Sequence, residues 1–183
     1  MNPVYVLGPS GVGKSTLARE TARHLQGVQF IDIDHEIRAR WPMLYSHTGN
    51  KWEEFFNKAM GLIENNVNGS EQGLLLVDLG AGCLEASSCC RFLTNVDQVV
   101  LVWAPATEVY ARHQTIRGGY WKGRSLEDFT KAEYGSSRTD IYSIAKHTVQ
   151  VGGIGVPESI DRFVETIEGI MDMLRRRIEN EQR

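Results

Sequence analysis

The chain has 183 residues, of which 42% are hydrophobic and 23% are charged, a composition typical of one globular domain. Its net charge of −3 argues against nucleic acid as a general partner. Three cysteines, Cys83, Cys89 and Cys90, form no CxxC pair, which argues against a disulfide framework or a zinc site. No secretory signal and no apolar run of membrane-spanning length is visible, so we expect a cytoplasmic protein without a membrane partner.

Apolar runs and helical patterns alternate along the chain. The runs that predict β-strands are Val4–Leu7, Val28–Ile33, Leu74–Leu79, Val99–Trp103 and about 148–151. Because they are almost continuously apolar, they indicate a sheet that is buried on both faces, which is typical of parallel strands. Helical spacing marks Ser15–Leu25, Lys51–Val67 and a C-terminal segment that opens at Pro157. This alternation predicts an α/β sandwich.

A glycine-rich motif follows the first predicted strand and opens the first predicted helix. Residues 8–15 read Gly-Pro-Ser-Gly-Val-Gly-Lys-Ser and match G-x-x-x-x-G-K-[ST]. The glycines let successive backbone N–H groups point at phosphate oxygens, and the helix start adds the positive end of its dipole. Lys14 can reach the β- and γ-phosphates, and the Ser15 hydroxyl can ligate magnesium. The expected nucleotide-binding residues are Gly8, Ser10, Gly11, Val12, Gly13, Lys14, Ser15 and Thr16.

Acidic residues stand where two of the predicted strands end. Asp32 and Asp34 close the second strand, and their alternate positions put them on the same side of it. Ligands of open α/β sheets bind beyond the carboxyl ends of the strands, so these carboxylates are candidates for holding magnesium and for orienting an attacking hydroxyl. The alternative role for Asp34 is to cap the helix that follows. Asp78 ends the third strand and is a further candidate magnesium ligand or a turn cap.

These motifs together resemble those of shikimate kinase and of close relatives such as gluconate kinase. The resemblance rests on the phosphate loop, on Phe30-Ile31-Asp32-Ile33-Asp34-His35-Glu36-Ile37, on Gly80-Ala81-Gly82 and on the segment from Arg138 to Ala145. It spans most of the chain, and the phosphate loop is its most specific part.

The resemblance implies a three-layer α/β/α sandwich with a five-stranded parallel sheet in the order 2-3-1-4-5. It implies one kinase domain over residues 1–183 with a helical lid insertion at about 112–137. It also implies roles for individual residues. Asp32 helps to hold magnesium, Asp34 contacts the substrate hydroxyl, and Arg117 closes over the phosphates. The remaining implied contacts are Arg112 near the nucleotide base, and Gly80, Ala81, Gly82 and Arg138 at the acidic substrate.

The chain departs from the family pattern at the acceptor end. The family carries a substrate arginine after a phenylalanine in the third helix, whereas Asn57 and Lys58 follow Phe56 here. A lysine lacks the planar fork that suits a carboxylate. In the lid, Arg117 is followed by Gly118-Gly119-Tyr120-Trp121 instead of proline and leucines. These departures predict an altered acceptor site.

We therefore expect a monomeric kinase that uses ATP and Mg²⁺ to phosphorylate a hydroxyl of a small polar metabolite. Other acceptors remain open, namely a nucleoside, a nucleotide or the end of a polynucleotide. A different class is also open: a switch protein that hydrolyses nucleotide slowly and signals by its conformation. The chain has no guanine-reading N-K-x-D motif, which favours ATP over GTP.

Overall fold

Five parallel strands form the centre of the molecule in the computed structural model, which describes residues 1–45, 51–69, 73–115 and 120–181. The strands are β1 (Asn2–Leu7), β2 (Val28–Asp32), β3 (Leu74–Asp78), β4 (Val99–Trp103) and β5 (His147–Gln150). Within the described residues they form one sheet in the order β2-β3-β1-β4-β5. The predicted parallel sheet and its strand order are confirmed.

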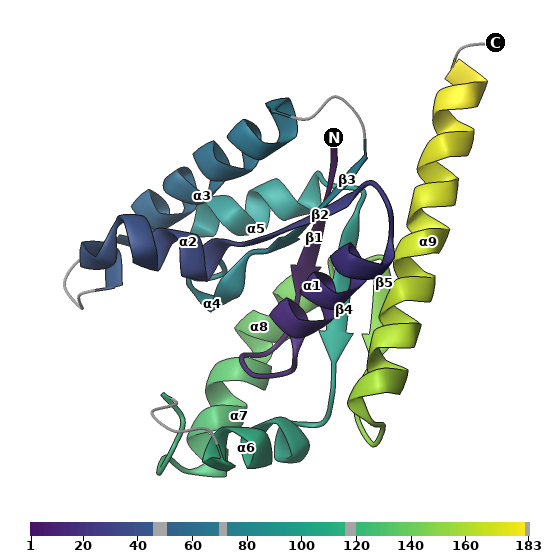
Figure 1. Ribbon diagram of the computed structural model, residues 1–183. Helices are drawn as coiled ribbons and strands as arrows, with labels where there is room; N and C mark the ends of the chain where they lie inside the picture. Colours follow the sequence, from purple (N-terminus) through teal and green to yellow (C-terminus); the bar gives the residue numbers. More distant parts are fainter. Residues whose placement is uncertain (46–50, 70–72, 116–119, 182–183) are drawn as a thin grey trace.

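Helices cover both faces of this sheet (Figure 1). One face carries α1 (Lys14–His24) and the long C-terminal helix α9 (Val156–Glu181). The other carries α2 (Ile33–Arg40), η1 (Pro42–Tyr45), α3 (Lys51–Asn68), α4 (Gly80–Cys83) and α5 (Ser87–Thr94). Toward the carboxyl ends of the strands lie α6 (Ala106–Thr115), α7 (Leu126–Tyr134) and α8 (Ser136–Tyr142). No helix in the described ranges is both long enough and apolar enough to cross a membrane.

Alternate residues of each strand enter different hydrophobic cores. In β1, Val4 and Val6 pack with α1 and α9, whereas Tyr5 and Leu7 pack with α3 and α5. This alternation follows from the two-residue period of a strand, and it explains why the strands read as unbroken apolar runs. The sheet is therefore buried on both faces. Ligands can approach it at the row of carboxyl ends of its strands.

The segment predicted as a lid insertion packs into the core that Val4 and Val6 share with α1 and α9. Trp121 is 6% exposed and Phe129 is fully buried, and their rings meet edge to face at 5.3 Å between centroids. The Arg124 guanidinium lies 4.0 Å from the centroid of the Tyr120 ring. Helix α7 lies within the range predicted as a helical lid insertion. The short helices α4, α5, α6 and α8 were not predicted, because each offers too few turns for a clear helical period.

Packing of α9 on the sheet predicts a stability difference along one helix. Phe163 is fully buried, whereas Met173 on the same helix is 44% exposed. Phe163→Ala is expected to lower the free energy of unfolding by about 3–5 kcal/mol, because it leaves a cavity in the core. Met173→Ala, the control, is expected to change it by about 0.5 kcal/mol or less. Urea titration followed by circular dichroism measures both, and equal effects would contradict this account of α9.

Candidate active site

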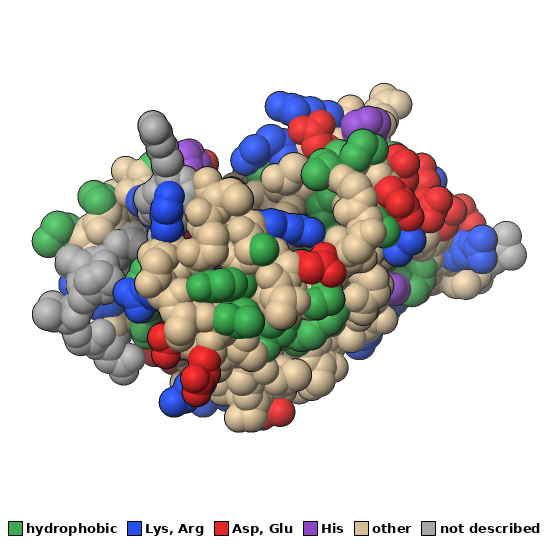
Figure 2. Space-filling view, turned by 90° about the horizontal axis from the view of Figure 1, so that it is seen from below, with side chains coloured by type: hydrophobic (Ala, Val, Ile, Leu, Met, Phe, Trp, Pro, Cys, Tyr) green, Lys and Arg blue, Asp and Glu red, His purple; other side chains and the backbone are tan. Residues whose placement is uncertain are grey.

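The register of the parallel strands brings the predicted site residues to one edge of the sheet. Asp78 pairs with Val6 of β1 on one side and with Asp32 of β2 on the other. A cavity of about 290 Å³ opens at this edge, and we call it the phosphate-loop cavity. Figure 2 looks onto this end of the molecule and shows basic and acidic side chains close together near the middle of the face.

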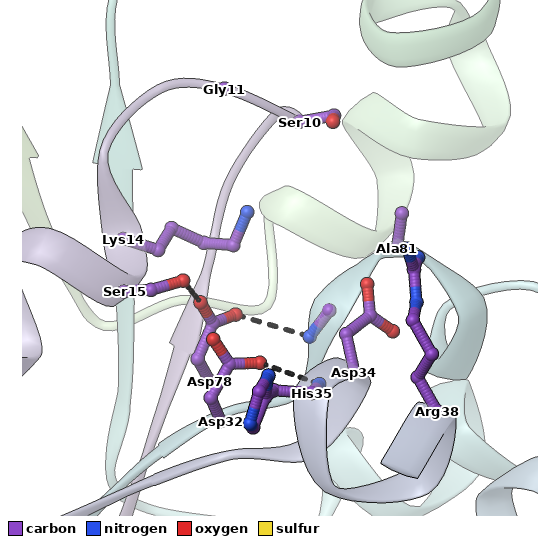
Figure 3. A pocket seen from close by; sticks show the side chains of 11 residues that line it. Ser10, Gly11, Lys14, Ser15, Asp32, Asp34, His35, Arg38, Asp78 and Ala81 are labelled. Atoms are coloured by element: carbon purple, nitrogen blue, oxygen red, sulfur yellow. Dashed lines mark hydrogen bonds between the residues drawn. The ribbon is translucent and has the colours of Figure 1, made fainter. Parts of the chain in front are cut away.

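The loop between β1 and α1 forms one wall of the cavity (Figure 3). Gly11 has a φ of +78°, and a Cβ at this position would lie 2.4 Å from His113 Nε2. A side chain at residue 11 therefore fits neither the backbone conformation nor the space. Lys14 Nζ donates to the carbonyl oxygens of Gly8 and Pro9, at 3.0 and 3.2 Å. The Lys14 ammonium group is thus held by two carbonyl oxygens of its own loop.

Helices α6 and α7 hold the loop from outside through three hydrogen bonds. Arg112 Nη1 donates to the Val12 carbonyl oxygen at 3.0 Å, and His113 Nε2 lies 2.8 Å from the Ser10 carbonyl oxygen. Because a carbonyl can only accept, His113 carries its proton on Nε2 in this contact. The Ser10 backbone N–H donates to Glu133 Oε2 at 3.0 Å. A carboxylate of the protein thus accepts a hydrogen bond from one of the N–H groups of the phosphate loop.

Two of the predicted metal ligands meet directly. Ser15 Oγ donates to Asp78 Oδ2 at 2.6 Å, and the Gly80 N–H donates to Asp78 Oδ1 at 3.1 Å. Asp78 is only 3% exposed, so both of its oxygens are tied to the protein in a buried setting. The hydrogen bond from Gly80 shows Asp78 in the turn-capping role considered for it, and the hydrogen bond from Ser15 places it next to the other predicted magnesium ligand.

Asp32 and Asp34 do not lie on the same side of one strand, so that prediction is wrong. Strand β2 ends at Asp32, and Ile33 already begins α2, so the two residues do not share a strand face. Asp32, not Asp34, caps the helix, since its Oδ1 accepts from the His35 N–H at 3.0 Å. Asp34 lies in the first turn of α2. Both side chains still line the phosphate-loop cavity, because the helix turns its first residues toward it.

Gly80 stands against Asp34 at the end of the cavity away from α1. A Cβ on Gly80 would lie 2.3 Å from the Asp34 carboxyl carbon, and its φ of +69° favours glycine. Ala81 also lines the cavity. Gly82 is oriented differently: its Cα hydrogen faces the rings of Trp52 and Phe55, which a Cβ would meet at 3.0 and 3.2 Å. The glycine triplet thus serves close packing at both ends.

The structure separates one predicted arginine, Arg138, from the phosphate-loop cavity. Arg138 is 7% exposed and forms an ion pair with Glu85. Its guanidinium also donates to the Ala81 carbonyl oxygen at 3.4 Å, and it lines a second cavity with Glu85. Arg138 thus lies behind the Ala81 backbone, and Ala81 lines the phosphate-loop cavity. Arg117 lies outside the described residues, as does the Gly118-Gly119 pair that follows it.

Four residues that contact or line the site were not predicted: His35, Arg38, His113 and Glu133. His113 and Glu133 reach the loop only through tertiary packing, and no local pattern marks them. Arg38 lines the cavity beside Asp34, and here a signal did exist. Residues four apart on a helix share a face, so a helix that starts near Asp34 would have placed Arg38 with it.

Comparison with known proteins agrees with the geometry. The family model described as shikimate kinase matches residues 10–168. The shikimate kinase of Bordetella avium (strain 197N) is 31% identical over 114 residues, 60% of this chain and 52% of that protein. The chain thus spans about half the length of this curated relative.

Solved structures share the fold. Shikimate kinase from Bacteroides thetaiotaomicron superposes with a TM-score of 0.74 at 18% identity, covering 93% of this chain and 98% of the other. Shikimate kinase from Acinetobacter baumannii in complex with shikimate gives 0.62 at 21% identity, covering 94% of each chain. At such identities the superpositions speak for the fold alone, while the family match spans most of the sequence. The chain belongs to the shikimate kinase family.

Proposed function

We propose that this protein is an ATP- and Mg²⁺-dependent kinase that phosphorylates a hydroxyl of a small polar metabolite, with an acceptor site altered from the family pattern. One observation carries the proposal. The phosphate loop, the Ser15–Asp78 pair and Asp34 line a single cavity at the carboxyl edge of the sheet. A phosphate donor and an acceptor hydroxyl can therefore meet in it without moving between sites.

The donor end is built for a triphosphate. Backbone N–H groups of residues 10–15 and the start of α1 favour anions, and Lys14 adds a positive charge. Lys14 now donates to carbonyls of its own loop, and phosphate oxygens would offer it stronger, charged acceptors. Arg112 and Arg117 are proposed to complete nucleotide binding, Arg112 near the base and Arg117 over the phosphates.

The carboxylates at the ends of β2 and β3 suit a magnesium ion. No group of three or more His, Cys, Asp or Glu side chains in the described ranges is placed to hold a metal alone. This suits Mg²⁺, which binds through one or two protein carboxylates together with phosphates and water. Ser15 and Asp78, with Asp32 nearby, supply hard oxygen donors and would hold it. When bound, Mg²⁺ supplies positive charge that neutralises the triphosphate.

At the acceptor end, Asp34 is proposed to orient the attacking hydroxyl and to take its proton. The acceptor oxygen forms a bond to the γ-phosphorus, the bond from that phosphorus to the β,γ-bridging oxygen breaks, and ADP leaves. Lys14 stabilises the negative charge on the transferring group. Gly80, Ala81, Gly82 and Arg138 are proposed to shape the surface on which the acceptor rests, with Arg138 held behind Ala81 by Glu85.

The test of this proposal is an incubation of the protein with ATP, Mg²⁺ and a pool of metabolites containing shikimate, gluconate and nucleosides, read by mass spectrometry. One metabolite should gain a phosphoryl group, and Lys14→Ala should abolish that product. If ATP is bound or slowly hydrolysed and no metabolite gains phosphate, the slow switch becomes the better interpretation.

Removal of the Asp34 carboxylate should stop transfer while sparing the donor end. In Asp34→Asn, the rate of acceptor phosphorylation should fall about 100- to 10,000-fold, the usual contribution of general base catalysis. The Kd for ATP, measured by calorimetry, should stay within about threefold of the wild-type value, since Asp34 lies at the other end of the cavity from Lys14. Full turnover in the variant would show that the assigned role is wrong.

A methyl group at residue 80 should also impair catalysis through the Asp34 carboxylate. Gly80→Ala is expected to displace Asp34, because the added Cβ would overlap its carboxyl group. Turnover should fall by about 10-fold or more, because small misplacements of reacting groups slow a reaction strongly. Gly61→Ala is the matched control: residue 61 lies within α3 with open space around it, so the helix should be unchanged or slightly more stable. Equal turnover in the two variants would contradict this packing argument.

Nucleotide must also replace Glu133 at the Ser10 N–H. Glu133→Gln removes a negative charge from the phosphate site, so ATP should bind about 3- to 10-fold more tightly. Glu127→Gln, on the exposed side of the same helix, should leave the Kd unchanged. Weaker ATP binding in Glu133→Gln would show instead that this carboxylate holds the loop in its binding shape.

A further inference from the structure

The acceptor end of the phosphate-loop cavity carries a positive charge that the family resemblance does not supply. Arg38 lies one helical turn after Asp34 in α2, and both side chains line the cavity. Figure 3 shows the two side chains rising from α2 toward Ala81, away from the loop that holds Lys14. Among the described residues lining this cavity, Lys14 and Arg38 are its lysine and arginine residues.

Two other cations considered for the acceptor do not line this cavity. Lys58 stands next to the position of the family's third-helix arginine. Its Nζ lies 5.1 Å from the centroid of the Trp41 ring, and it is not among the residues that line the phosphate-loop cavity. Arg138 is buried against Glu85 and lines a different cavity. Arg38 is exposed to solvent at the cavity, where an incoming ligand can reach it.

We propose that Arg38 binds a carboxylate of the acceptor, so that α2 supplies both the base for the hydroxyl and the cation for the anionic group. This inference rests on the proposed function. A guanidinium offers a planar pair of N–H donors that match the two oxygens of a carboxylate, which a lysine cannot do. The charge that the family places on its third helix is thereby provided by the second helix.

The spacing of the two residues limits the acceptor. Side chains at i and i+4 of a helix have Cβ atoms about 5–6 Å apart. Asp34 and Arg38 can therefore act on the hydroxyl and on the carboxylate of one compact hydroxy acid at the same time.

The experiment compares Arg38→Gln, Arg38→Lys and Arg40→Gln with the wild type. Arg40 is the matched control, because it is exposed on the same helix, pairs with Glu36 at 2.8 Å and lines another cavity. Acceptors are tested as charged and uncharged pairs, shikimate with its methyl ester and gluconate with glucitol, together with nucleosides and nucleoside monophosphates. KM and kcat are measured for whichever compound is phosphorylated.

The wild type should phosphorylate a hydroxy acid and leave its uncharged counterpart almost untouched. Arg38→Gln should raise KM for that acid about 10- to 100-fold, with a smaller effect on kcat, because it removes a charged hydrogen bond. Arg38→Lys should give an intermediate KM, and Arg40→Gln should stay within about twofold. Added salt should raise the wild-type KM more than that of Arg38→Gln.

Two results would overturn the inference while leaving the kinase in place: phosphorylation of an uncharged compound or a nucleotide as the preferred acceptor, or equal KM values for Arg38→Gln and Arg40→Gln. If the wild type binds ATP and phosphorylates nothing in the panel, the proposed function is wrong, and the role of Arg38 is wrong with it.

Discussion

The parallel register of β1 beside β3 is the constraint on which the site depends. It fixes Asp78 next to Val6, so that the loop leaving β1 curls over the carboxylate that ends β3. The Ser15–Asp78 hydrogen bond of 2.6 Å and the Gly80–Asp78 bond of 3.1 Å join three segments through one buried side chain. The phosphate loop, the Ser15–Asp78 pair proposed to hold magnesium and the turn that meets Asp34 are thus held by two strands buried on both faces.

The polar groups that would receive a nucleotide are satisfied by the protein itself. Lys14 donates to loop carbonyls, Ser10 N–H donates to Glu133, and Ser15 donates to Asp78. Binding therefore exchanges one set of hydrogen bonds for another, and the gain comes from the charge of the phosphates in a field of N–H groups and the helix dipole. Since Glu133 belongs to α7 and His113 and Arg112 to α6, this exchange reaches the helices that flank the loop.

The sequence was informative wherever a local period or a fixed spacing determined the structure. Continuous apolar runs predicted the strands, and the glycine spacing with Lys14 and Ser15 predicted the phosphate loop. Strand alternation failed at Asp34, because the chain turns into a helix one residue earlier than the apolar run suggests. The contacts of Gly80 with Asp34 and of Glu133 with Ser10 depend on tertiary approach, which no spacing records. Arg38 lies between these cases, since its position follows from the helix period only once the start of α2 is known.

The proposal that donor and acceptor meet in a single cavity has one chemical consequence that is independent of the acceptor's charge. Transfer should pass directly from ATP to the acceptor oxygen, with the attacking and leaving oxygens in line. The measurement is the stereochemical course of transfer from ATP made chiral at the γ-phosphorus with oxygen isotopes. Direct transfer in the phosphate-loop cavity predicts inversion at phosphorus. Retention would require a phosphorylated protein intermediate and would contradict the arrangement of Lys14, Asp34 and the loop proposed here.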